Sequence, residues 1–239
     1  MFCDEASNRK RQVLVIWVFE VSLRLKHSTA TTFIAVSLID RYLTRVSVAA
    51  RHLQLVGVTA LYIACKFQEI MFTSAGELAH YTNKACTKED IIRMERRMLR
   101  VLNFQVNNPH GYEFLERYWT VSGESRKAFF IAQLCYELGM LEERLIAVPH
   151  SIKACAALYI AISFESRKRG GGRGAPPLPP TWSAELETVS GYKAATVHEV
   201  AQKMLNAVKD YKDRERCRGI VRKYSLPEFG AISLRDFIP

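Results

Sequence analysis

Three features that would mark a common class of protein are missing from this sequence. Its six cysteines are widely spaced and include no C-x-x-C pair, so no zinc-ribbon motif is present. No glycine-rich phosphate loop follows a strand, and the six histidines are scattered, so no catalytic constellation is visible. The longest apolar stretch, residues 53–65, is shorter than the roughly 20 residues that a membrane-spanning helix needs. We therefore predict no enzymatic activity, no cofactor, no metal and no membrane partner.

The composition instead provides enough apolar side chains for buried cores and an excess of positive charge. Apolar residues make up 49% of the 239 residues, a length that fits one large domain or two of about 110–120 residues. The formal net charge of +10 suits acidic partners, nucleic acid or a nuclear address, or simply a cationic surface. Cys65 and Cys155 lie inside apolar runs and no secretory signal precedes them, which indicates reduced thiols in an intracellular protein.

One short sequence, ALYIA, occurs twice. The copies are at residues 60–64 and 157–161, and a phenylalanine follows in step at Phe67 and Phe164, so each pair is 97 positions apart. Apolar spacing is helical nearly throughout, and the first copy lies in a helix that is apolar on almost all sides, which is typical of the centre of a bundle. The sequence therefore predicts an all-α protein of two tandem five-helix folds, the first at residues 1–106 and the second at residues 107–239.

The same patterns place the individual helices. The first half is predicted to have helices at residues 11–25, 31–43, 51–67, 74–81 and 87–102, the last opened by a capping box at Thr87. The second half is predicted to have helices at residues 112–119, 126–141, 150–164 and, from a capping box at Thr196, to 212. Residues 166–180 are rich in glycine, proline and basic residues and predict a flexible insertion: a solvated loop, a localisation signal or an acid-binding segment. The tail after residue 222 is expected to be irregular.

Two carboxylates lie where helical spacing calls for apolar side chains. Asp40 falls on the apolar stripe of the predicted second helix, and Glu95 falls within that of the fifth. Burying an unpaired carboxylate costs several kcal/mol, so each is expected to have a cationic partner. Arg11 is the candidate for Asp40. Lys66 approaches the same end of the first repeat as Glu95, but the pattern equally allows Glu95 to face water and Lys66 to serve as a cation at a helix C-terminus.

Several segments in a fixed order resemble the cyclin box of A- and B-type mitotic cyclins. They are VLVIWVFEV at 13–21, LIDRYL at 38–43, LQLVGVTALYIACKFQEI at 53–70, RMERRMLRVLNF at 93–104, YELGML at 136–141 and VRKYSLPEFGAISL at 221–234. The likeness extends over most of the chain, and the combination is far more specific than a single ALYIA. The resemblance implies an N-terminal cyclin box followed by a second cyclin fold.

The resemblance also implies a function. Cyclins are activating, regulatory subunits that form heterodimers with cyclin-dependent protein kinases in cell-cycle control, so the protein is expected in the nucleus and cytoplasm. The first fold carries the main kinase-binding residues of the family, which hold the αC region of the kinase. By this resemblance the kinase-binding residues are Lys66, Glu95, Phe67 and Leu99. Arg11 and Asp40 match the buried pair that stabilises the box.

A second surface follows from the same resemblance. Cyclins of this class dock Arg-x-Leu segments of substrates and inhibitors in a groove on the first and third helices. Its matching residues here are Val13, Leu14, Trp17, Glu20, Val21 and Gln54. Lys10 stands where the family usually has methionine and Ile16 where it has aspartate, so docking is expected to be weakened or altered. The alternative is that Trp17 and Leu14 only pack the first helix.

The main alternative function is a DNA-binding protein with the same doubled fold, like general transcription factor B. The basic charge would suit phosphate contacts. Four arginines of the fifth predicted helix form a face that is either solvated or a binding site: Arg93, Arg96, Arg97 and Arg100. Such factors carry an N-terminal zinc ribbon, which this sequence lacks, so nucleic acid is not the expected partner.

The upstream helix and destruction motif of mitotic cyclins are also missing, so Met1 is expected to be the start of a shortened chain.

Overall fold

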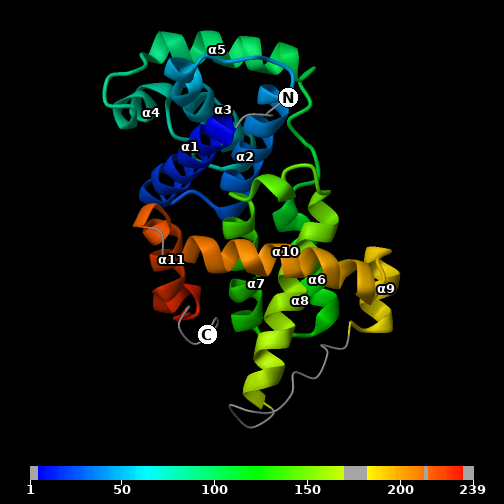
Figure 1. Cartoon of the computed structure of the whole chain (residues 1–239). Coiled ribbons are helices and arrows are strands. Elements are labelled where there is room, and N and C mark those ends of the chain that lie inside the picture. The colour runs from blue at the N-terminus through cyan, green and yellow to red at the C-terminus, as the bar shows by residue number, and fades with distance from the viewer. Residues whose placement is uncertain (1–4, 170–181, 213–214, 234–239) are drawn as a thin grey trace. The chain divides into compact units, whose positions relative to one another are not determined.

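The computed structural model describes residues 5–169, 182–212 and 215–233, and every regular element in these ranges is a helix (Figure 1). The prediction of an all-α chain is confirmed. The chain forms two compact units, Met1–His110 and Gly111–Pro239. None of the described helices combines the length and the apolar character that crossing a membrane requires.

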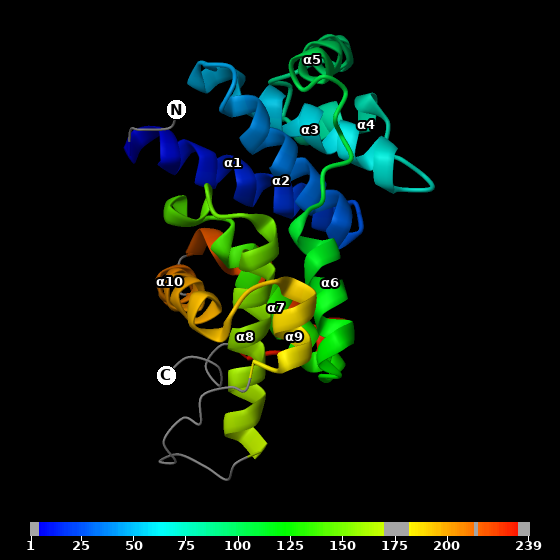
Figure 2. The same ribbon diagram turned by 90° about the vertical axis from the view of Figure 1, so that its right-hand side faces the viewer.

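The first unit is a bundle around one central helix, α3 (Leu53–Gln68), which follows a short 3-10 turn, η1 (Ala50–His52). The surrounding helices are α1 (Glu5–Arg24), α2 (Thr29–Leu43), α4 (Ala75–Tyr81) and α5 (Lys88–Val101). All four contact α3 (Figures 1 and 2). Most of the α3 side chains between Val56 and Cys65 are fully buried, as expected for a helix that is apolar on nearly all sides.

Local sequence explains where these helices begin and how closely they pack. Thr87 and Asp90 form the predicted capping box at the start of α5, and Ser74 and Glu77 form a second capping box at the start of α4. Gly57 lets α1 approach α3, because a Cβ atom at this position would lie only 2.6 Å from the side chain of Leu14. The close approach buries the α3-facing side of α1.

The second unit has the same plan around α8 (His150–Arg169). Its neighbours in the bundle are α6 (Gly111–Ser122), α7 (Arg126–Gly139), α9 (Ala184–Ser190) and α10 (Ala194–Lys212), and all four contact α8 (Figure 2). A further helix, α11 (Arg218–Ser225), packs on α7. The described residues of this unit also form 3-10 turns at Glu143–Leu145, Glu215–Cys217 and Pro227–Phe229.

Three predictions for the second unit are wrong. Thr196 does not open α10, which begins at Ala194, where the backbone N–H donates to Oε1 of Glu187 in α9 at 3.0 Å. A side chain from another helix therefore supplies the cap, and local sequence does not show it. The start of the tail is not irregular, because α11 extends to Ser225 and a 3-10 turn follows. Residues 166–169 of the predicted insertion belong to α8, and residues 170–180 lie outside the described part of the chain.

Candidate functional site

Lys66, in the last turn of α3, forms an ion pair with Glu95 in the middle of α5. The side chain of Lys66 is 35% exposed and that of Glu95 only 12% exposed. The Lys66 ammonium also lies 4.5 Å from the ring centroid of Tyr62, one turn earlier in α3, so a carboxylate and an aromatic face hold it together. Because an ammonium has three N–H donors, Lys66 can donate to an acceptor on a partner while Glu95 remains bound.

Large apolar side chains are exposed in the segments that follow this ion pair in the chain. They are Phe67, Ile70, Met71 and Phe72 after Lys66, and Phe104 after α5. Ile70 is 99% exposed, which is unusual for a side chain of this kind. Leu99, on α5, is partly buried and packs against the core. Exposed apolar side chains that form a contiguous patch are typical of binding surfaces.

Sequence reasoning found Phe67 but did not single out Ile70, Met71, Phe72 or Phe104. The available signal was the run Ile-Met-Phe directly after the central helix, where a turn normally has polar residues. The backbone gives a second signal at Phe104. This residue adopts φ 56° directly after Asn103 at φ 52°, and left-handed backbone is rare for a bulky residue and is enriched at functional sites.

A group of polar contacts, here called the clasp, fixes both ends of the segment that carries Ile70 and Met71. Oε1 of Glu69 accepts hydrogen bonds from the backbone N–H of Ser28 at 2.7 Å and from the hydroxyl of Thr31 at 2.5 Å. At the other end, the hydroxyl of Thr73 lies 2.7 Å from Nε2 of His27. The clasp thus ties the α3–α4 loop to the turn between α1 and α2.

Burial and hydrogen bonding shift the pKa values of the two titratable groups in the clasp. Burial lowers the pKa of His27 below its ordinary value, and the nearby carboxylate of Glu69 only partly opposes this. Burial alone would raise the pKa of Glu69, but hydrogen bonds from Thr31 and Ser28 outweigh it and lower the pKa below its ordinary value. At neutral pH the clasp therefore contains a neutral imidazole and an ionised carboxylate.

The structure brings Arg11 and Asp40 together in a bidentate ion pair between α1 and α2. Nε and Nη2 of Arg11 donate to the two carboxylate oxygens of Asp40 at 2.6 and 2.7 Å. Arg11 is 2% exposed and Asp40 is 23% exposed. Two parallel charge-assisted hydrogen bonds fix both the distance and the orientation of these helices.

A second buried ion pair, which sequence reasoning missed, lies in the second unit. Oε1 of Glu137 in α7 accepts hydrogen bonds from Nζ of Lys223 and from the hydroxyl of Tyr224, both at 2.7 Å. Glu137 is fully buried. Burial and the adjacent carboxylate raise the pKa of Tyr224 well above its ordinary value, so its hydroxyl stays protonated and donates. These contacts attach α11 to α7.

The residues of the expected docking groove divide into two groups. Val13 is 46% exposed, and Trp17, Glu20 and Gln54 are half-buried, so these four keep accessible surface. Leu14 and Val21 are instead buried in the core and do not line a surface. The reason is helical spacing: Leu14 lies against Gly57 of α3, and Val21 lies seven residues later on the same side of α1, within the core cluster. Among the described residues no group of three or more potential metal ligands occurs.

This combination of a doubled five-helix bundle, a Lys–Glu pair and a buried Arg–Asp pair is what the resemblance to cyclins implies. Comparison with known families matches the N-terminal domain of cyclins to residues 2–107 and the C-terminal domain of cyclins to residues 109–236. The chain belongs to the cyclin family. The prediction of a mitotic-like cyclin with two tandem cyclin folds is confirmed.

Individual relatives agree with this assignment. A protein named G2/mitotic-specific cyclin-B from Dictyostelium discoideum is 31% identical over 234 residues, which are 97% of this chain and 51% of that protein. The G2/mitotic-specific cyclin cdc13 of Schizosaccharomyces pombe is 31% identical over 236 residues, 98% of this chain and 46% of that protein. The chain thus spans about half the length of these relatives. The crystal structure of a viral cyclin from herpesvirus saimiri superposes with a TM-score of 0.72 at 15% identity, covering 85% of this chain and 86% of that one, and supports the fold.

Proposed function

We propose that this chain is the regulatory subunit of a cyclin-dependent protein kinase, acts in cell-cycle control, and binds the kinase through the surface around Lys66 and Glu95. The observation that carries the proposal is a partly exposed ion pair flanked in the chain by exposed apolar side chains, including Phe67 and Phe104. The names of the G2/mitotic-specific relatives support a role in the cell cycle. The alternative of a DNA-binding factor of the general transcription factor B type has no support among these matches.

The proposed surface has the properties of a binding hot spot. Apolar anchors such as Phe67 and Ile70 would be buried by the kinase and would exclude water from the ion pair. Lys66 then offers N–H donors to backbone carbonyl groups of the kinase αC region, and Glu95 accepts from its backbone N–H groups. The clasp holds the loop in place before binding, which reduces the entropy lost on association.

The proposed mechanism is a shift of the kinase towards its active state. A protein kinase positions ATP correctly only when the glutamate of its αC helix pairs with the lysine of strand β3. A partner that binds the active position of αC more tightly than the inactive one favours this pairing, and the shift cannot exceed the difference between the two affinities. We assign no catalytic step to residues of this chain.

Titration calorimetry of the chain against a purified cyclin-dependent kinase tests the proposal. Lys66→Ala and Glu95→Ala are each expected to weaken binding by about 2–4 kcal/mol, because truncating a charged hot spot leaves its partner buried and unpaired. The matched control is Lys88→Ala, which removes an exposed cation from the start of α5 and should bind like the wild type. Wild-type affinity in both site variants, with melting curves unchanged, would contradict the assignment.

We also propose that the accessible part of the docking groove binds Arg-x-Leu segments weakly. The proposed location of the protein is the nucleus and cytoplasm. Exposed apolar surface at Val13 supports this, as does the half-buried carboxylate of Glu20, which suits an arginine. Lys10 is exposed and repels that arginine. Val13→Asp should remove the binding of an Arg-x-Leu peptide without changing kinase affinity. Unchanged peptide binding in this variant would show that the segment docks elsewhere.

A further inference from the structure

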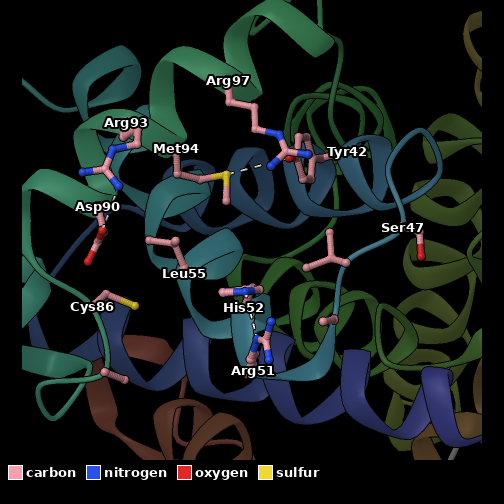
Figure 3. Close-up of a pocket in the computed structure, with 13 residues that line it drawn as sticks. Tyr42, Ser47, Arg51, His52, Leu55, Cys86, Asp90, Arg93, Met94 and Arg97 are labelled. Carbon is pink, nitrogen blue, oxygen red and sulfur yellow. Dashed lines mark hydrogen bonds and ion pairs between the residues drawn. The ribbon is translucent and has the colours of Figure 1, made fainter.

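The first unit contains a pocket of about 390 Å³ at the opposite end of α3 from Lys66. Arg51 and His52 of η1 and Leu55 of α3 line one side of the pocket, and the first turns of α5 line another (Figure 3). Leu55 precedes Lys66 by 11 residues, which is roughly 16 Å along a helix axis. The pocket is therefore distant from Lys66 along α3, although on α5 its lining residues Met94 and Arg97 stand on either side of Glu95 in the sequence.

Positive charge dominates the polar side chains of this pocket. Arg93 and Arg97 extend from α5, one turn apart on the same helix face, and Arg51 lies across the pocket (Figure 3). Among the described residues, no carboxylate forms an ion pair with Arg97 or Arg51. Nε of Arg51 donates to Nε2 of His52 at 3.1 Å, which holds the imidazole beside the guanidinium. Three cationic groups thus surround one concave space.

Asp90 is the only carboxylate among the described residues that line the pocket, and other contacts already occupy it. Its Oδ2 accepts hydrogen bonds from the backbone N–H of Thr87 at 3.1 Å and from the Thr87 hydroxyl at 2.8 Å. Its Oδ1 lies 3.5 Å from Nη1 of Arg93. Asp90 therefore compensates at most one arginine, and two positive charges of the pocket remain uncompensated.

The rest of the lining distinguishes between anionic partners. Leu55 and Met94 give the pocket an aliphatic wall, and Tyr42 is fully buried with its hydroxyl 3.8 Å from the sulfur of Met94. Nucleic-acid sites instead combine a groove that follows the backbone with exposed aromatic rings on which bases stack. A half-open pocket with exposed arginines around it and one aliphatic wall suits a single doubly charged group next to an apolar side chain.

We propose that this pocket binds a phosphorylated serine or threonine of a partner polypeptide. At neutral pH the phosphate monoester carries nearly two negative charges, which match the two uncompensated positive charges. Guanidinium groups bind phosphate oxygens with paired hydrogen bonds, and a ring of arginines is the common solution for phosphopeptide recognition. The volume lies near the lower end of the range for pockets that hold a small-molecule ligand. An apolar residue next to the phosphorylated one packs on Leu55 and Met94.

The four arginines of α5 fall into two pairs according to whether they line the pocket. Arg93 and Arg97 line the pocket, whereas Arg96 and Arg100 of the same helix do not. All four are exposed, so glutamine at any of them leaves the core intact. Arg96 and Arg100 therefore provide a control of equal charge on the same helix.

Two immobilised-protein experiments with matched peptide libraries test the proposal on the full chain. One library has phosphoserine at a fixed central position between randomised residues, and the other has serine there. We expect the phosphoserine library to be retained at least about 10-fold more, because each charge-assisted hydrogen bond contributes substantially to affinity. The double variant Arg51→Gln/Arg97→Gln should lose this excess, and the control Arg96→Gln/Arg100→Gln should keep it.

Four results would overturn the proposal. Equal retention of the two libraries would show that phosphate is not recognised, and equal losses in the two double variants would show binding to overall charge. Inorganic phosphate that binds as tightly as the best phosphopeptide would mean that the site takes the free ion rather than a polypeptide. An RNA oligonucleotide that binds more tightly, and whose binding needs Arg51 and Arg97, would assign the pocket to nucleic acid.

Discussion

The two units repeat one helical plan at a constant spacing, and they differ in how they satisfy the same buried charge. Ser28 caps α2 and Ser125, 97 positions later, caps α7. The two copies of ALYIA in α3 and α8 keep this spacing. The carboxylates Asp40 and Glu137 keep it too, so each unit places an acid at the same position of its second helix.

The cationic partner comes from opposite directions in the chain. In the first unit Arg11 lies in α1, upstream of the acid, because α1 begins at Glu5. In the second unit α6 begins only at Gly111, so Asn108, the counterpart of Arg11, precedes the helix. Lys223 of α11, downstream of the bundle, pairs with Glu137 instead. The repeat thus determines the position of the buried acid. The cation comes from a helix that differs between the units, α1 in the first and α11 in the second.

The largest expected effect comes from removing these cations. Lys223→Met should destabilise the second unit by about 3–5 kcal/mol, because Glu137 is fully buried and would lose its counter-charge. Arg11→Met should destabilise the first unit by only about 1.5–3 kcal/mol, since Asp40 keeps contact with water. Urea titrations followed by hydrogen exchange in α2 and α7 report the two units separately.

A double variant isolates the role of the charge. Lys223→Met/Glu137→Gln removes both charges, keeps an acceptor for Tyr224, and should recover part of the stability lost in Lys223→Met. An equal loss in the single and double variants would show that packing of the Lys223 side chain, and not its charge, stabilises α11.

The next comparison concerns the ends of the two central helices. Lys66 in α3 corresponds to Ser163 in α8, whose hydroxyl donates to the backbone carbonyl of Tyr159 at 2.7 Å. Tyr62 in α3 lies beside the Lys66 ammonium, whereas Tyr159 in α8 is buried and its hydroxyl lies 3.1 Å from Nδ1 of His198. At these two positions, the side chains of the second unit form hydrogen bonds within their own bundle. Those of the first unit hold a partly exposed ammonium at the surface.

Exchanging these two residues tests whether the difference decides function. Lys66→Ser should weaken kinase binding by about 2–4 kcal/mol, the range for loss of a charged hot spot. Ser163→Lys should leave kinase affinity unchanged, because the second unit has no exposed apolar cluster comparable to Phe67 and its neighbours among the described residues. Calorimetry on both variants measures this, and tighter binding by Ser163→Lys would show that the second unit also contacts the kinase.

Sequence predicted those parts of the structure that depend on neighbouring residues. The apolar helices and the capping box at Thr87 follow from local spacing, and Asp40 was recognised because it interrupts an apolar stripe. The start of α10 depends on Glu187 from another helix, and the partner of Glu137 lies 86 positions further along the chain. These contacts join distant residues and leave no periodic pattern, whereas the position of Glu137 itself follows from Asp40 by the 97-residue repeat.

The additional turns of α1, which α6 lacks, also carry Lys10 and Val13 of the proposed groove. Lys10→Met should strengthen binding of an Arg-x-Leu peptide by about 1 kcal/mol, through added apolar burial and removal of a repulsive charge. Kinase activity towards a peptide without this motif should not change. Calorimetry with the peptide decides it, and no gain in affinity would show that Lys10 does not face the bound segment.

The smallest expected effect is a difference in pH dependence between the units. His27 and Glu69 of the clasp correspond to Glu124 and Ser166 in the second unit, so only the first unit has this histidine–carboxylate arrangement. The pKa of His27 is lowered by burial, so below the ordinary histidine value of 6.5 the unfolded chain binds a proton that the folded chain excludes. The lowered pKa of Glu69 acts in the same direction at more acidic pH.

The contribution of His27 to the stability of the first unit should therefore be fully present above pH 6.5 and should decrease as the pH falls below it. In His27→Gln the amide can still contact Thr73 but does not titrate. The loss of stability between pH 7.5 and 5.5 should therefore be smaller than in the wild type. Both pH values are about one unit from the ordinary pKa of histidine. His80→Gln changes an exposed histidine of the same unit and should behave like the wild type. Urea midpoints at the two pH values measure the effect. An identical shift in all three proteins would mean that folding does not change the pKa of His27, so the clasp would not contribute to the pH dependence.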